Sequence, residues 1–108
     1  MAGHLVTFPL PARAYETIMR EAVLRGDNST LALESREALT TAAPLSDGMW
    51  VVDCTDEVSR DIEDWFEMAA MVESATPKGD ERRFEMLKSA VSAVRDGRAK
   101  SRLEEGSR

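Results

Sequence analysis

The chain has 108 residues, of which 43% are apolar and 31% are charged, as is typical of one soluble globular domain with a modest core. It contains no run of about 18 apolar residues that could span a membrane, and its net charge of −6 argues against a surface devoted to nucleic acid or anionic lipid. A single cysteine, Cys54, cannot form an internal disulfide, and the N-terminus does not resemble a secretory signal. We therefore expect a cytoplasmic protein.

The charge is distributed unevenly along the chain. Residues 1–77 contain 5 Lys and Arg against 14 Asp and Glu, a net charge of −9, whereas residues 78–108 contain 9 against 6, a net charge of +3. The sequence therefore predicts an acidic body followed by a basic C-terminal segment.

The N-terminal part of the chain reads as one strand and two helices. Leu5–Phe8 is a run of β-forming residues that ends at a pair of prolines, and the second of these, Pro11, suits the first turn of a helix. Apolar residues recur at helical spacing from Ala12 to Arg25, and Gly26 is the expected stop. A second helix, with a smaller apolar face, is expected at about Thr30 to Ala42.

The centre of the chain has the clearest pattern. Met49–Val52 is apolar on both alternating faces, so we expect a strand that is covered on both sides. Thr55 is a favourable N-cap, and the acidic residues after it suit the positive end of a helix dipole. The helix that follows places carboxylates on one face and an apolar stripe on the other. The stripe consists of Val58, Ile62, Trp65, Phe66, Ala69 and Val72.

The C-terminal segment reads as one helix and a tail. The helix is expected from about Glu81 to Asp96, with Gly97 as its stop. Residues 98–108 are polar and charged, so we expect a frayed or disordered tail. The sequence therefore predicts one α+β domain over residues 1–97, in the order β-α-α-β-α-α, with a short two-stranded sheet covered by about four helices.

Two short strands make a marginal sheet with open edges. An apolar strand whose edge is open can pair with a strand of another chain. We therefore predict a homodimer, formed either by continuing the sheet across a two-fold axis or by packing helices together. The alternative is a monomer whose strand edges are covered by Pro9, Pro11 and loops.

The sequence contains no motif for catalysis, a metal ion, a nucleotide or another cofactor, so we predict a non-enzymatic protein. Cys54 precedes a helix N-terminus, but neighbouring acidic residues would raise its pKa, and we interpret it as a small buried residue. His4 has no neighbour with which to bind zinc or form a catalytic pair. The aspartates between positions 53 and 64 lack the loop spacing of a calcium or magnesium site, and a solvated helix face explains them better.

The acidic helix is the strongest candidate for a binding surface. Met68 and Met71 fall on its acidic side, away from the apolar stripe, and methionine is over-represented at adaptable binding surfaces. The alternative is that the last helix folds back and covers them. We predict a small cytosolic regulator, inhibitor or adaptor that binds a protein partner through this helix. The residues predicted to bind the partner are Glu57, Asp61, Asp64, Glu67, Met68 and Met71.

A second hypothesis is a dimeric, nucleic-acid-associated regulator that uses the basic C-terminal segment. Its candidate contacts are Arg82, Arg83, Arg95, Arg98, Lys100 and Arg102. Interspersed acidic residues dilute this positive charge. We therefore favour pairing of the basic helix with the acidic helix before it, in an antiparallel hairpin or across a dimer. A helix-turn-helix is also disfavoured, because Arg36 is the only cation of its second helix.

Overall fold

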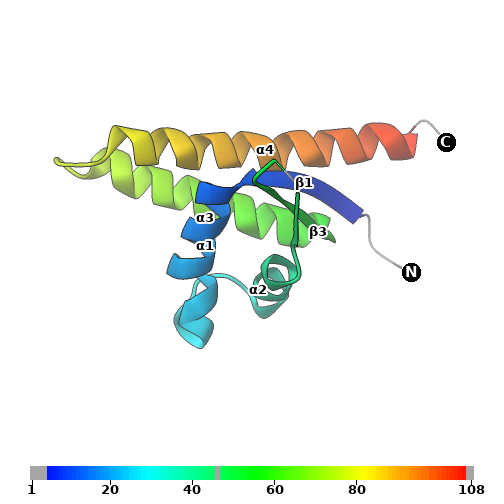
Figure 1. Cartoon of the computed structure of the whole chain (residues 1–108), viewed down its shortest axis with the longest axis horizontal. Helices are drawn as coiled ribbons and strands as arrows, with labels where there is room; N and C mark the ends of the chain where they lie inside the picture. Colours follow the sequence, from blue (N-terminus) through cyan, green and yellow to red (C-terminus); the bar gives the residue numbers. More distant parts are fainter. Residues whose placement is uncertain (1–4, 46, 107–108) are drawn as a thin grey trace.

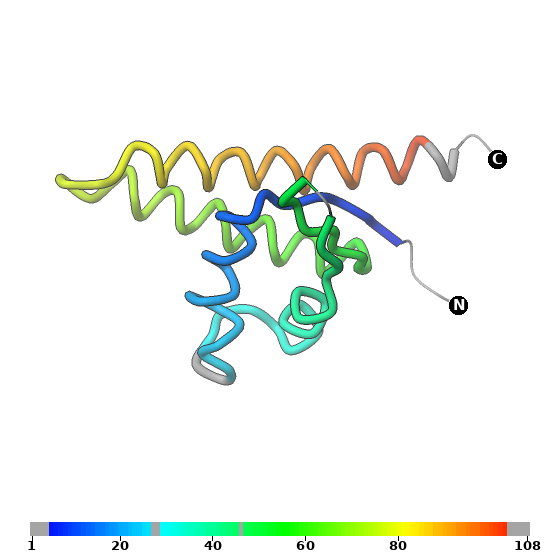
Figure 2. Tube along the Cα trace, viewed as in Figure 1, coloured from blue at the N-terminus to red at the C-terminus, as the bar shows by residue number. Residues whose placement is uncertain are grey.

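The computed structural model describes residues 5–45 and 47–106 and has an α+β fold (Figure 1). In chain order the elements are β1 (Leu5–Pro11), α1 (Ala12–Glu21), the 3-10 helix η1 (Val23–Asn28), α2 (Leu33–Thr40), β2 (Ala43–Pro44), β3 (Met49–Thr55), α3 (Asp56–Ala75) and α4 (Glu81–Gly106). Helices α3 and α4 run antiparallel along the long axis, and α1, η1 and α2 are grouped on the side away from α4 (Figure 1). Figure 2 shows that β1 begins at the same end of the molecule at which α4 ends.

The sheet has three antiparallel strands in the order β1-β3-β2, and not the two strands that the sequence predicted. The central strand, β3, pairs along its whole length with β1, and β2 pairs with it opposite Val51 and Trp50. The additional strand was missed because its two residues, one of them a proline, carry no alternating pattern.

One face of this sheet is buried against the helices. Phe8 of β1 lies opposite Val52 of β3, and both side chains are fully buried in the core. On the other face, Met49 and Val51 are only half-buried. The expectation that this strand is covered on both sides is therefore wrong for this chain, because the core residues of the sheet all lie on its inner face.

Both edges of the sheet carry prolines. β1 forms one edge and contains Pro9 and Pro11, whereas β2 forms the other edge and ends in Pro44. Proline has no backbone N–H to donate to a further strand. A further strand would therefore find no N–H donor at these prolines, as in the monomer alternative, and the homodimer stays a prediction.

Helices α1 and α2 are shorter than predicted. The first ends at Glu21, and the chain continues as η1, in which Gly26 has a φ of 59° that glycine adopts without strain. The second begins later than predicted, at Leu33. Tyr15 joins the two helices, because its hydroxyl donates a hydrogen bond of 2.7 Å to the carbonyl oxygen of Leu39.

Helix α3 begins where the sequence predicts. Oγ1 of Thr55 accepts a hydrogen bond of 3.2 Å from the backbone N–H of Val58, which caps the helix. Ile62 and Phe66 of the predicted stripe are fully buried. The stripe ends before its last predicted member, because Val72 lies beyond the packed part of the helix and is 60% exposed.

Helix α4 is longer than predicted and continues through Gly97 to Gly106. The expected tail is therefore helical from residue 98 to residue 106. Gly97 does not end the helix but lies against β1. A Cβ added there would lie 2.6 Å from Cβ of Phe8 and 2.7 Å from the carbonyl oxygen of Thr7. The missing side chain allows the backbone of α4 to approach β1 closely.

We expect Gly97→Ala to lower the free energy of unfolding by about 1–3 kcal/mol, because the added methyl group overpacks the contact with β1. At an exposed helix position the same change would raise it by about 0.5–1 kcal/mol. Urea unfolding measures the effect, with Ser92→Ala at an exposed position of α4 as the control for helix propensity. A stabilised Gly97→Ala protein would contradict the close approach.

Candidate protein-interaction surface

Glu63 of α3 points into the interface with α4 and is 7% exposed. Its carboxylate accepts a hydrogen bond of 2.9 Å from Nε of Arg95 and one of 2.5 Å from Arg98. Arg95 also donates to Glu67, and Arg98 lies 3.5 Å from Oγ of Ser59. Acidic α3 and basic α4 thus pair within one chain, which confirms the antiparallel-hairpin form of the predicted pairing.

The environment of Glu63 favours its ionised form. Burial alone would raise the pKa of its carboxyl, but the hydrogen bonds from Arg95 and Arg98 outweigh burial and hold the pKa below the usual value. Ionised Glu63 therefore contributes stability at a pH above its ordinary pKa of 4.5, and this contribution is lost as the pH falls through the folded-state pKa.

Asp61, which the sequence places in the binding set, is bound to α2. Its Oδ2 accepts a hydrogen bond of 2.6 Å from Oγ of Ser35 and one of 3.0 Å from the backbone N–H of Ala32. Ala32 is the N-cap residue of α2 and has no side-chain oxygen with which to cap the helix. Asp61 therefore supplies an acceptor at that helix end. Glu67 is also engaged, by an ion pair with Arg95 of α4.

The other predicted residues of α3 lie on its exposed side. Glu57 and Asp64 are exposed, and the side chains of Met68 and Met71 are 61% and 64% exposed. Val72 adds a third exposed apolar side chain next to them. The alternative that the last helix covers the methionines is not seen, because α4 packs on the Glu63 side of α3. We refer to Glu57, Asp64, Met68, Met71 and Val72 as the outer stripe.

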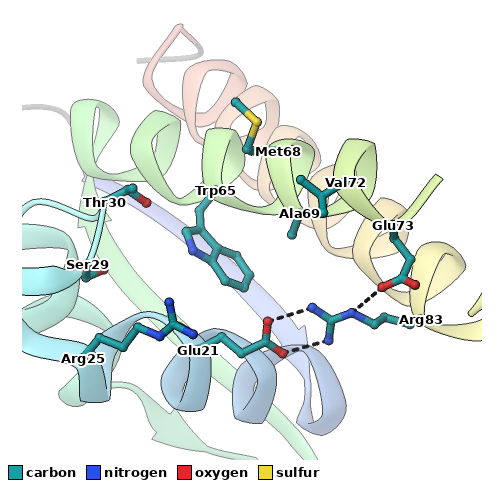
Figure 3. A pocket seen from close by; sticks show the side chains of 10 residues that line it. All are labelled: Glu21, Arg25, Ser29, Thr30, Trp65, Met68, Ala69, Val72, Glu73 and Arg83. Carbon is teal, nitrogen blue, oxygen red and sulfur yellow. Dashed lines mark hydrogen bonds and ion pairs between the residues drawn. The ribbon is translucent and has the colours of Figure 1, made fainter. Parts of the chain in front are cut away.

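A groove of about 280 Å³ lies beside the outer stripe, and we refer to it as the Trp65 groove (Figure 3). Trp65, Met68 and Val72 line it from α3, and Glu21 and Arg25 line it from α1 and η1. Trp65 was predicted to be buried but is only half-buried, and its ring lies between the two walls of the groove. The sequence did not reveal this groove, because one wall comes from a segment about 40 residues earlier, whose position only the fold determines.

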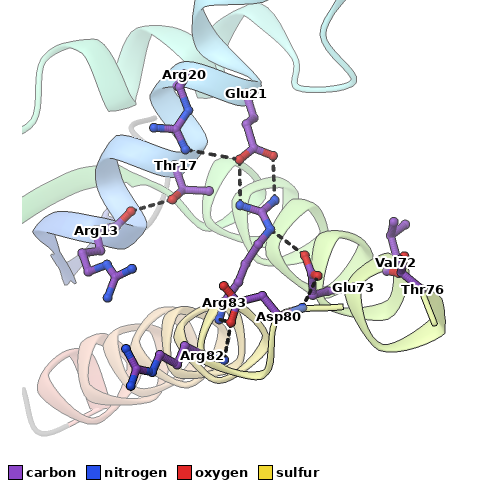
Figure 4. A network of polar contacts seen from close by, with 10 residues as sticks. All are labelled: Arg13, Thr17, Arg20, Glu21, Val72, Glu73, Thr76, Asp80, Arg82 and Arg83. Carbon is purple, nitrogen blue, oxygen red and sulfur yellow. Dashed lines mark hydrogen bonds and ion pairs between the residues drawn. The ribbon is translucent and has the colours of Figure 1, made fainter. Parts of the chain in front are cut away.

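Arg83 connects three helices at one end of the Trp65 groove (Figure 4). Its terminal nitrogens donate hydrogen bonds of 2.8 and 2.7 Å to Glu21, and its Nε donates one of 2.7 Å to Glu73. The hydrogen bonds from Arg83 hold the pKa of Glu21 below its usual value, and those to Glu21 raise the pKa of Arg83. Both carboxylates that line the groove are therefore already bound to a cation.

Arg25 is the other cation that lines the Trp65 groove. Its side chain is exposed and extends toward the Trp65 ring (Figure 3). Among the residues whose side chains the structure describes, no carboxylate pairs with Arg25.

Most of the cations predicted to contact nucleic acid are engaged within the chain. The engaged residues are Arg83, Arg95, Arg98 and Arg102. The last of them lies 3.8 Å from Asp56 of α3. Arg82 and Lys100 are exposed.

Cys54 is buried, as the sequence predicts. Burial, together with the charges of Asp53 and Asp56, raises the pKa of its thiol to about 12, so it is protonated and unreactive at neutral pH. Among the side chains that the structure describes, which leaves out positions 27, 28 and 104–106, no three of His, Cys, Asp or Glu are grouped as they would be around a metal ion. Over residues 5–45 and 47–106, no helix has the length and apolar character to cross a membrane.

Comparisons with known proteins return no match to a protein family, to a curated protein or to a solved structure.

We expect Arg98→Met to lower the free energy of unfolding at pH 7 by roughly 1–3 kcal/mol, because the buried carboxylate of Glu63 loses one of its two cations. Arg60→Met is the matched control, since it breaks an exposed pair with Asp56 and should have little effect.

The difference between wild type and Arg98→Met should shrink as the pH falls through the folded-state pKa of Glu63, which lies below the ordinary value of 4.5, because the protonated carboxyl no longer attracts the arginine. Urea unfolding over a series of pH values from 7 downwards measures this. Two results would contradict this role of Glu63: an equal loss of unfolding free energy in Arg98→Met and Arg60→Met, or a loss in Arg98→Met that does not depend on pH.

Proposed function

We propose that this chain is a small non-enzymatic interaction module, acting as a regulator, inhibitor or adaptor, that binds a protein partner through the outer stripe of α3. The observation that carries the proposal is the exposure of Met68, Met71 and Val72 together on one side of a helix whose other side is packed. Contiguous apolar side chains on the surface of a protein mark sites that another molecule covers.

The outer stripe has two halves of different chemistry. Glu57 and Asp64 make its N-terminal half acidic, whereas the two methionines and Val72 make its C-terminal half apolar. Flexible methionine side chains adapt to the shape of a partner, and the carboxylates speed and select the encounter. The matching partner therefore presents cations next to large apolar side chains.

The length of the stripe suits a segment of secondary structure in the partner. Residues 57–72 cover roughly 22 Å of helix at about 1.5 Å per residue. A standard interface covers about 800 Å² on each protein, which is more than a single helix stripe offers. The contact would therefore extend from the stripe over the adjoining Trp65 groove.

We propose a different protein, and not a second copy of the chain, as the partner of the stripe. None of the five residues of the stripe is a cation, and Arg60, which lies between Glu57 and Asp64 along α3, is already paired with Asp56. Two copies would set the carboxylates of Glu57 and Asp64 against each other or against methionines, and an unpaired carboxylate is costly to bury. The homodimer stays a prediction from the sequence, and its interface would have to lie elsewhere.

The nucleic-acid hypothesis has less support. Binding to phosphates requires cations that can replace counterions along the strand. Of the six candidate residues, four are paired with carboxylates of the same chain.

The proposal of a non-enzymatic, cytoplasmic protein is supported by the state of Cys54. It is a free thiol with no disulfide partner in the sequence, as is usual in a reducing compartment. Its raised pKa also argues against a role as a nucleophile.

We expect the double variant Glu57→Lys/Asp64→Lys to lose the partner, because it reverses the acidic half of the stripe. The control is Glu16→Lys/Glu85→Lys, which changes the net charge equally at exposed positions of α1 and α4. Each immobilised protein, shown by circular dichroism to be folded, is exposed to nuclease-treated cytosol, and quantitative mass spectrometry compares what it retains. The proposal predicts at least one cytosolic protein that the wild type and the control both retain in an amount at least tenfold larger than the stripe variant does.

Two results would contradict the proposal. One is an identical set of retained proteins for the wild type and the stripe variant. The other is a retained species that proves to be a nucleic acid, released by high salt and lost when Arg82 and Lys100 are reversed to glutamate.

A further inference from the structure

The Trp65 groove opens onto the outer stripe, since Met68 and Val72 belong to both. Its volume of about 280 Å³ lies just below the range of roughly 300–1,000 Å³ that is common for small-molecule pockets. Space of this size, open to the stripe, suits one or two side chains of a docked protein. The half-buried ring of Trp65 supplies an aromatic surface on which an apolar side chain can pack.

The charges of the groove favour an anion. Glu21 and Glu73 are both hydrogen-bonded to Arg83, at 2.7–2.8 Å, and Arg20 lies 3.6 Å from Glu21, so two cations offset the two carboxylates within the protein. Arg25 is exposed and has no carboxylate partner among the side chains that the structure describes. A guanidinium group in this state binds a carboxylate well, because its planar array of N–H donors matches the two oxygens.

We infer that the Trp65 groove receives an anchor from the partner of the outer stripe: a large apolar side chain that packs on Trp65, next to a carboxylate that binds Arg25. This inference rests on the proposed function, because the partner that occupies the stripe also supplies the anchor. The partner is then an amphipathic protein segment with cations opposite Glu57 and Asp64, apolar side chains opposite the methionines, and a carboxylate at the groove.

The anchor can be tested without knowing the partner, with 2-naphthoate standing in for the apolar side chain and its neighbouring carboxylate. The chain has two tryptophans, Trp50 and Trp65, whose indole N–H groups give two signals in a ¹H–¹⁵N spectrum. Trp50 stacks on Tyr15 with ring centroids 4.3 Å apart and serves as the internal control. Naphthoate should shift the Trp65 signal saturably, with a dissociation constant on the order of 1 mM, as is usual for a fragment of this size.

Matched probes and variants identify the group that binds the carboxylate. Naphthylmethylammonium has the same ring system and the opposite charge, and should leave the Trp65 signal in place. Arg25→Gln should weaken naphthoate binding about tenfold. Arg13→Gln, at an exposed position of α1 outside the groove, should leave it unchanged. An unshifted Trp65 signal, equal effects of the two probes, or equal effects of the two variants would each overturn the inference.

The inference and the proposed function fail in different ways. The stripe variant Glu57→Lys/Asp64→Lys lies outside the groove and should bind naphthoate as the wild type does. If the wild type binds naphthoate but the stripe variant retains the same cytosolic proteins, the proposed function fails while the groove stands as an anion site. If the stripe captures a protein that Arg25→Glu binds as tightly as the wild type, the anchor is overturned and the proposed function stands.

Discussion

The structure depends on one buried carboxylate. Glu63 lies between α3 and α4, where an ionised side chain is tolerated only if cations and hydrogen bonds replace the water that it loses. Arg95 and Arg98 supply both, from positions three residues apart on the facing helix. These ion pairs, together with the apolar core that the two helices share, fix the rotation of α3 against α4, and Gly97, between the two arginines, brings the same helix against β1.

That rotation decides which charges of the protein are available to other molecules. Glu63 and Glu67 of α3 face α4, and the carboxylate of Asp61 accepts hydrogen bonds at the start of α2. What remains outside is a stripe with acidic residues at one end and exposed methionines at the other. The internal ion pairs also engage four of the six cations predicted to contact nucleic acid, which is why we propose a protein partner and not nucleic acid.

The sequence predicts α3 well, because its capping threonine and its apolar spacing are local signals that the core reinforces. A helical wheel also separates Met68 and Met71 from the buried stripe. It does not show which neighbour approaches each face, so it could not distinguish the engaged carboxylate of Asp61 from the exposed one of Asp64. Strand β2 and the contact at Gly97 were missed for a related reason: both are defined by pairing with distant residues and not by a local pattern.

The most direct test of this account is a residue-specific titration of the Glu63 side-chain carboxyl carbon by NMR. The account predicts a midpoint below the ordinary glutamate value of 4.5, and a midpoint that rises in the Arg98→Met protein. A midpoint at or above 4.5 in the wild type would mean that the two arginines do not hold this carboxylate. The division of α3 into an engaged side and an available side would then lose its basis.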